Sequence, residues 1–104
     1  MIENYIARKI KEEFLTLLKE YPVVTILGPR QAGKTTFARN SLPEYEYVNM
    51  EIPENRDLAH RDPKTFLSGL HNRVILDEVQ RVPHLLSYIQ AEVDEHQNNG
   101  QYVL

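Results

Sequence analysis

The sequence contains no cysteine and no tryptophan, and it has no excess of basic residues. Without cysteine, the chain forms neither disulfides nor thiolate metal sites. The net charge of −3 means that no overall positive field attracts nucleic acid. Charge therefore does not support a nucleic-acid partner, and only a local basic patch would leave one open.

Long apolar runs are also missing. The longest runs, such as residues 23–27, fall far below the ~20 residues that a membrane-spanning helix needs. The start, MIENYIARKI, mixes charged and apolar side chains and lacks the apolar core of a signal peptide. The 104 residues are 41% hydrophobic and 26% charged, which is typical of one soluble globular domain. We therefore expect a cytoplasmic protein that makes no membrane contact.

The most informative segment is a β-branched run at residues 23–27 followed by GPRQAGKTT. It fits the phosphate-binding pattern G-x-x-x-x-G-K-[ST] at Gly28, Gly33, Lys34 and Thr35. A strand is expected before this loop and a helix after it, which is the context that the pattern requires. The alternative, a glycine-rich turn with a surface lysine, does not account for the strand and the helix.

The chemistry of such a loop follows from its residue types. Glycines let backbone N–H groups approach a phosphate closely, and a helix N-terminus adds the positive end of its dipole. Lys34 would contact the β- and γ-phosphates, and the hydroxyl of Thr35 would face Mg²⁺. The guanidinium of Arg30 would either approach phosphate or pack against the domain.

Two acidic residues, Asp77 and Glu78, follow the apolar strand predicted at residues 73–76. They should lie at the carboxyl edge of a parallel sheet, where ligands bind in open α/β folds. Asp77 would hold Mg²⁺ through water, and Glu78 would orient or deprotonate an attacking water. The alternative is a pair of solvated acids at the end of a strand, but the phosphate-binding loop upstream favours the functional interpretation.

Strands alternate with helices along the chain, which predicts an α/β fold with a parallel sheet. Strands are expected at residues 23–27, 45–50, 73–76 and 101–104, and helices at about 2–21, 34–40, within 52–70, and 83–98. The first helix either covers the domain's own sheet, which its apolar spacing favours, or faces a partner or membrane. We expect Tyr45, Tyr47 and Tyr102 to pack rather than stack on bases, and the four histidines show no metal-binding spacing.

Three separated segments resemble one family: GPRQAGKTT, YVNMEIPENRDLAHRDPKTFL and VILDEVQRVPHLLSYIQAEVDE. The family is that of prokaryotic AAA-type ATPases with a GPRQ-x-GKTT Walker A loop and an LDEVQR-x-P Walker B segment. Its members usually carry a C-terminal nuclease-like domain of unknown function. The resemblance covers residues 5–104 and implies a P-loop NTPase of the ASCE/AAA type, with flanking helices on a parallel sheet in the order 5-1-4-3-2.

The resemblance implies that residues 1–104 form a partial ATP-binding domain with its N-terminal helix at about 2–21, P-loop at 28–35 and Walker B segment at 74–78. Its cofactors would be ATP and Mg²⁺, and its activity Mg²⁺-dependent ATP hydrolysis. The nucleotide-binding residues would be Gly28, Pro29, Arg30, Gln31, Ala32, Gly33, Lys34, Thr35 and Thr36. Lys34 and Glu78 would be catalytic, and Thr35 and Asp77 would hold the metal ion.

The family's sensor position, fifth strand, neighbour-directed arginine and C-terminal domain have no counterpart in this sequence. We therefore expect a chain truncated after the fourth strand, with residues 23–27 at an exposed sheet edge that favours homo-oligomers or other association. Hydrolysis is expected to be weak. The alternatives are a nucleotide-binding module or a remnant fragment without turnover, while the lack of an N-K-x-D motif disfavours a GTPase.

Overall fold

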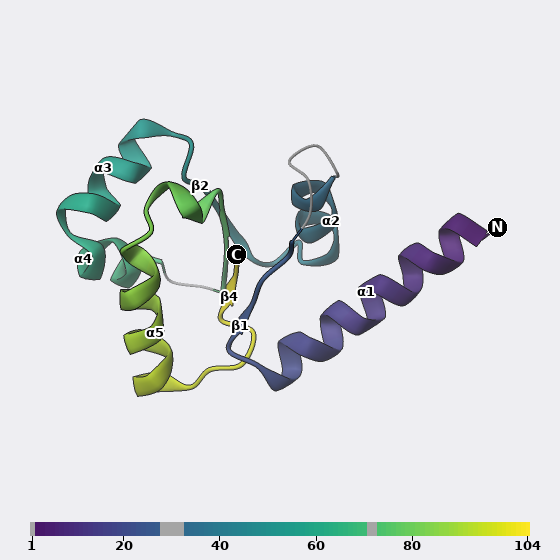
Figure 1. Ribbon diagram of the computed structural model, residues 1–104. Coiled ribbons are helices and arrows are strands. Elements are labelled where there is room, and N and C mark those ends of the chain that lie inside the picture. Colours follow the sequence, from purple (N-terminus) through teal and green to yellow (C-terminus); the bar gives the residue numbers. More distant parts are fainter. Residues whose placement is uncertain (1, 28–32, 71–72) are drawn as a thin grey trace.

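The computed structural model describes residues 2–27, 33–70 and 73–104, with side chains from residue 8 onward (Figure 1). Helices and strands alternate along these residues, which confirms the predicted α/β fold class. In chain order the elements are α1 (Ile2–Glu20), β1 (Val23–Val24), α2 (Lys34–Ser41), β2 (Glu46–Asn49), α3 (Pro53–Arg61), α4 (Pro63–Ser68), β3 (Val74–Asp77), a 3₁₀ turn η1 (Val79–Arg81), α5 (Leu85–His96) and β4 (Tyr102–Val103).

The described strands form one parallel sheet in the order β1-β4-β3-β2. This order agrees with the 1-4-3-2 part of the arrangement that the family resemblance implied. Val74 of β3 lies opposite Glu46 on one side and Tyr102 on the other. Because the strands are parallel, the residues that follow β1 and β3 meet at the same carboxyl edge.

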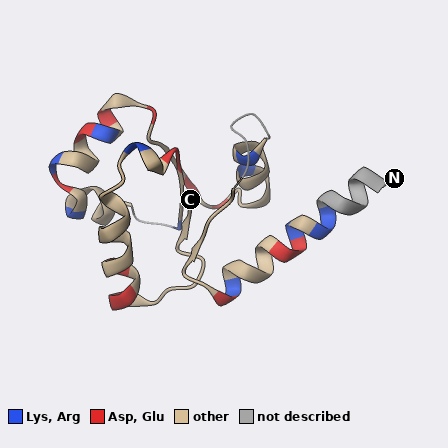
Figure 2. Cartoon of the chain, in the orientation of Figure 1, with Lys and Arg blue, Asp and Glu red and all other residues tan. Residues whose placement is uncertain are grey.

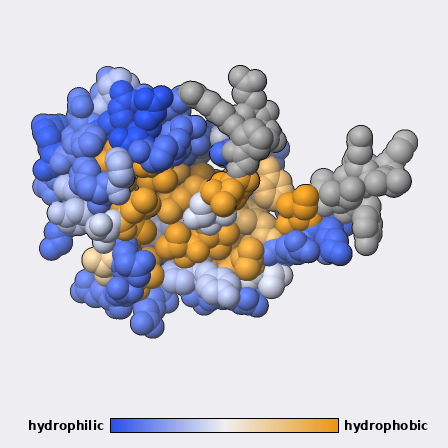
Figure 3. Space-filling model, viewed as in Figure 1, coloured by the Kyte–Doolittle hydropathy of each residue, from blue (hydrophilic) through white to orange (hydrophobic). Residues whose placement is uncertain are grey.

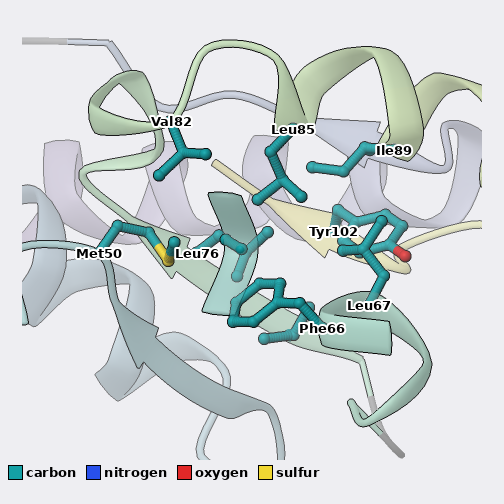
Figure 4. Packing of buried hydrophobic residues seen from close by; sticks show 10 residues of the cluster. Met50, Phe66, Leu67, Leu76, Val82, Leu85, Ile89 and Tyr102 are labelled. Carbon is teal, nitrogen blue, oxygen red and sulfur yellow. The ribbon is translucent and has the colours of Figure 1, made fainter. Parts of the chain in front are cut away.

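Helices flank the sheet, and one apolar cluster lies on each of its two faces. The cluster under α1 and α2 consists of Phe14, Leu18, Val24, Ala38, Leu42, Ile75 and Val103. The cluster under α3, α4 and α5 consists of Met50, Ala59, Phe66, Leu67, Val74, Leu76, Val82, Leu85, Ile89 and Tyr102 (Figure 4). Side chains alternate along a strand, so Asp77 lies on the same face of β3 as Ile75, the face that α2 covers.

The N-terminal helix α1 covers the sheet with its second half only. Phe14 and Leu18 are buried, and the Phe14 ring lies 5.4 Å from that of Phe37 on α2. The first half of α1 extends away from the body of the domain (Figure 1). This arrangement confirms the interpretation of α1 as a helix that packs on its own sheet. Among the described residues, no helix is long and apolar enough to cross a bilayer.

The first strand is shorter than the sequence suggested. Residues 23–27 were expected to form one strand at an exposed sheet edge, yet β1 spans Val23–Val24, and Leu27 is 86% exposed. The edge position itself agrees with the expectation, because β1 pairs with β4 alone among the described strands. One further backbone hydrogen bond, from Ile26 N to Leu104 O at 3.0 Å, extends the pairing beyond the strand.

Candidate functional site

The helix that follows the phosphate-binding loop starts at Lys34, as the sequence predicted. Gly33 immediately precedes it with φ 78°, a left-handed conformation that residues with a Cβ rarely adopt. The first N–H groups of an α-helix have no partner within the helix, and they carry the positive end of its dipole. α2 therefore presents backbone donors at the carboxyl edge of the sheet.

Five of the predicted nucleotide-binding residues lie outside the described residues, and the predictions for them stay predictions. They are Gly28, Pro29, Arg30, Gln31 and Ala32. Of the remaining loop positions, Lys34 and Thr35 line the cavity described below. The exposed Thr36 lines a neighbouring hollow beside Arg39, so the structure does not bring its side chain to this cavity.

The two predicted metal-binding side chains contact each other. Asp77 is the last residue of β3, and Thr35 lies in the first turn of α2, 42 positions earlier in the chain. Oγ1 of Thr35 donates a hydrogen bond of 3.0 Å to Oδ2 of Asp77. The contact follows from the packing of α2 on the face of β3 that carries Ile75 and Asp77. The packing of α2 on β3 therefore brings the two predicted motifs into contact.

Tyr47 on β2 belongs to the same group, which sequence reasoning missed. Its hydroxyl donates a hydrogen bond of 2.7 Å to Oδ2 of Asp77, and the guanidinium of Arg39 lies 4.3 Å above its ring. Burial, and secondarily the hydrogen bond to Asp77, raises the pKa of Tyr47 to about 12. The expected packing of Tyr47 is confirmed by its contact with the cluster under α1 and α2.

Glu78 has a left-handed backbone, with φ 59° and ψ 39°, directly after β3. This conformation costs a non-glycine residue roughly 1–3 kcal/mol and is concentrated at functional sites. Nε2 of Gln80 donates a hydrogen bond to Oε2 of Glu78, and Arg81 lies 3.7 Å from Glu51. The 3₁₀ turn η1, which the sequence did not indicate, holds Gln80 close enough for this contact.

A cavity of about 410 Å³ lies at the carboxyl edge of the sheet. Lys34, Thr35, Asp77 and Glu78 all contribute to its walls, so the four predicted catalytic and metal-binding residues lie together. The rest of the wall is largely apolar, and Figure 3 shows hydrophobic residues gathered across the middle of this face. These apolar residues include Ile26, Leu27, Leu86, Val103 and Leu104.

The donor set suits a magnesium nucleotide. Mg²⁺ takes oxygen ligands and is bound through one or two protein groups together with phosphates and water, rather than by a protein cage. Asp77 and Thr35 supply a carboxylate and a hydroxyl oxygen, and Lys34 supplies an ammonium group for phosphate. Consistent with this mode, the described residues contain no cluster of three or more metal-binding His, Asp or Glu side chains.

Acidic and basic residues are interspersed along the helices. Figure 2 shows both signs on the described part of α1 and around α3 and α4. This distribution agrees with the small net charge of −3. It adds no support for a nucleic-acid partner.

The fold and the grouped side chains define a parallel α/β domain of the AAA type. A family model described as an AAA domain matches residues 20–104, and the chain belongs to this family. Family membership indicates nucleotide-binding or ATPase-like activity. It agrees with the AAA-type family that the three sequence segments resemble.

Two curated relatives are uncharacterized proteins of mycobacteria. The chain is 41% identical over 80 residues to uncharacterized protein Mb2031c of Mycobacterium bovis and to uncharacterized protein Rv2008c of Mycobacterium tuberculosis. The alignment covers 74% of this chain but 18% of each relative, so the chain spans about a fifth of their length. No solved structure matches the chain.

Proposed function

We propose that the chain binds ATP with Mg²⁺ and hydrolyses it slowly. The observation that carries this proposal is the hydrogen bond of 3.0 Å between Thr35 and Asp77. It joins the Walker A pattern to the strand-end acid that would serve as Walker B. The two motifs were identified independently in the sequence, and a chance pair of motifs has no reason to meet in the fold.

Each side chain has a role that suits its place. The backbone of residues 28–36 would surround the phosphates, and Lys34 would neutralise part of their charge. Thr35 and Asp77 would hold Mg²⁺, with Asp77 acting through water. The bound ion supplies charge neutralisation on the phosphate oxygens. Glu78 would orient or deprotonate the attacking water.

Slow turnover is proposed because the sensor position and the neighbour-directed arginine of the family have no counterpart in this sequence. Phosphoryl transfer is accelerated mainly by positive groups that stabilise charge on the transferred phosphate, and an added arginine contributes about 10³–10⁵-fold. The chain should therefore bind nucleotide and hydrolyse it poorly.

A second candidate function is a nucleotide-binding module without turnover. The hydrogen bond from Gln80 to Glu78 favours it, because a carboxylate held by a neighbouring amide is less able to accept a proton from water. Phosphate release separates the two functions. A rate above background that depends on Glu78 supports the ATPase, and nucleotide binding without release supports the module.

The proposal has three further parts, which concern domain content, association and location. A C-terminal nuclease-like domain would fit the greater length of the relatives. The edge strand β1, beside the exposed Leu27, is the surface we propose for association with another strand or a second copy. A cytoplasmic location completes this proposal.

Thermal unfolding with and without Mg²⁺-ATP tests the binding function. Nucleotide at 100 times its dissociation constant should stabilise the fold by ~2.7 kcal/mol, which raises Tm by about 10 °C for a chain of this size. Lys34→Ala should abolish the shift. Lys11→Ala, an exposed lysine on α1, is the matched control and should keep it. A wild-type protein with no shift at any ATP concentration would refute both nucleotide-binding proposals.

A further inference from the structure

The register of β2 against β3 places Tyr47 diagonally before Asp77. Tyr47 pairs with Ile75, and Asn49 pairs with Asp77. Side chains two residues apart on a strand share one face, and a long aromatic side chain reaches its diagonal neighbour. The phenol therefore spans from β2 to the carboxylate of Asp77, where its hydroxyl donates the bond of 2.7 Å.

Two hydroxyl groups converge on one oxygen of Asp77. Thr35 donates to Oδ2 from α2, and Tyr47 donates to the same oxygen from β2. Thr35 could coordinate a metal ion through a lone pair of its hydroxyl oxygen while its O–H still donates to Asp77. Thr35 would then be a ligand itself, whereas the phenol of Tyr47 would act on the metal site only through Oδ2 of Asp77.

We propose that Tyr47 is a positioning residue, which holds Asp77 by Oδ2 so that the other carboxylate oxygen faces the metal ion and its water. The proposal rests on the proposed function, because it assigns Tyr47 a role at the same magnesium site. The guanidinium of Arg39, 4.3 Å above the ring, holds the phenol in place from α2. Such outer groups fix the orientation of a ligand, and their loss costs about 10–100-fold in metal affinity.

Tyr45, which directly precedes β2, provides a natural comparison. It contacts the same apolar cluster as Tyr47, but its hydroxyl donates to the backbone oxygen of Gly100 at 2.6 Å. Tyr45 and Tyr47 thus share residue type, packing and a hydrogen bond. They differ in whether that bond ends on Asp77, so a comparison of their phenylalanine variants isolates the effect on the metal site.

Binding of Mn²⁺ in the presence of ADP tests this role without any turnover. Mn²⁺ takes the same oxygen ligands as Mg²⁺, and loss of its free EPR signal reports binding. Tyr47→Phe should weaken Mn²⁺ binding by about 10-fold while ADP affinity in EDTA stays at the wild-type value. Tyr45→Phe should match wild type in both measurements.

Two results would overturn the positioning role alone. One is wild-type Mn²⁺ affinity in Tyr47→Phe, and the other is an equal loss of Mn²⁺ and of metal-free ADP binding, which would mean a purely structural role. A wild-type protein whose ADP binding is independent of metal would instead refute the proposed function, and this inference with it.

If Tyr47→Phe does not unfold cooperatively, a second variant tests the proposal. Arg39→Ala removes the cation above the ring and leaves the hydroxyl of Tyr47 in the chain. It should weaken Mn²⁺ binding by about 3-fold, the factor that an exposed cation–π contact contributes. Unchanged Mn²⁺ affinity in Arg39→Ala would then contradict the proposal.

Discussion

At the scale of single residues, Asp77 is the point at which three elements meet. α2 contributes Thr35, β2 contributes Tyr47, and β3 ends on the carboxylate itself. A half-buried carboxylate with two hydroxyl donors is held in one orientation, which is what a metal ligand requires. The next residue, Glu78, leaves the strand direction through its left-handed backbone, and we propose a separate role for it.

The proposed role of Glu78 gives a prediction at this scale. Glu78→Gln keeps the size of the side chain and removes its ability to accept a proton. We expect ATP binding to stay unchanged and phosphate release to fall by about 100-fold, the lower end of what a general base contributes. Single-turnover phosphate release measures the effect. A rate equal to that of wild type would show that Glu78 is not the base.

The sequence predicted some of these residues better than others. Lys34, Thr35, Asp77 and Glu78 belong to two local patterns with fixed spacing, so they were found without the fold. Tyr47 lies 30 positions before Asp77 in the chain, and no spacing rule links the two. Their contact depends on strand register, which a single sequence does not reveal.

At the scale of elements, the turn between α5 and β4 ties three parts of the fold together. Gly100 N donates to Tyr21 O at 2.8 Å, and Gly100 O accepts from the hydroxyl of Tyr45. Gly100 has φ 71°, and a Cβ there would lie 2.9 Å from both Leu18 O and Tyr45 Oη. Glycine is therefore required by conformation and by space.

Gly100→Ala should reduce the free energy of unfolding by about 1–3 kcal/mol, because the left-handed backbone and the close contacts both resist a Cβ. Urea unfolding measures the change. Gly69→Ala is the matched control, since Gly69 has φ −76° and a Cβ there would lie at 3.4 Å from Thr65 O. It should stay within about 0.5 kcal/mol of wild type, and equal losses in both variants would contradict the argument.

Some starts and ends of helices and strands follow from local sequence signals, and others do not. Pro53 and Pro63 begin α3 and α4, within the range of residues 52–70 where helices were expected, because the fixed φ of proline suits the first helical position. The expected helix start at Pro83 was wrong, because Pro83 and His84 lie in a turn whose carbonyls accept from Leu86 N and Ser87 N, and α5 begins at Leu85. β1 also ends early, since it spans Val23–Val24 although the apolar run continues to residue 27.

At the scale of the whole molecule, an apolar cluster lies between the sheet and the helices on each face. The cluster under α3, α4 and α5 contains a buried tyrosine, Tyr102, which should make the free energy of unfolding depend on pH. Tyr102 is 3% exposed within the cluster under α3, α4 and α5. Burial, and secondarily the charge of Glu92, raises the pKa of Tyr102 to about 12. Above pH 10 the unfolded chain loses this proton while the folded chain keeps it, so folding becomes less favourable.

The contribution of Tyr102 to the free energy of unfolding should therefore be constant below pH 10. It should fall between pH 10 and 12, by on the order of 2 kcal/mol. Tyr102→Phe removes the titrating group and should flatten part of this decrease. Urea unfolding at a series of pH values checks it. A decrease of the same size in the variant would mean that Tyr102 does not couple pH to folding.

For the whole molecule, we propose a single magnesium-nucleotide site at the carboxyl edge of the sheet, formed by α2 and β3. Calorimetric titration of ATP into the wild-type chain at saturating Mg²⁺ tests whether this site exists. The predicted result is one site per chain, which disappears in Lys34→Ala. Binding that persists unchanged in Lys34→Ala, or no binding by the wild-type chain, would contradict it.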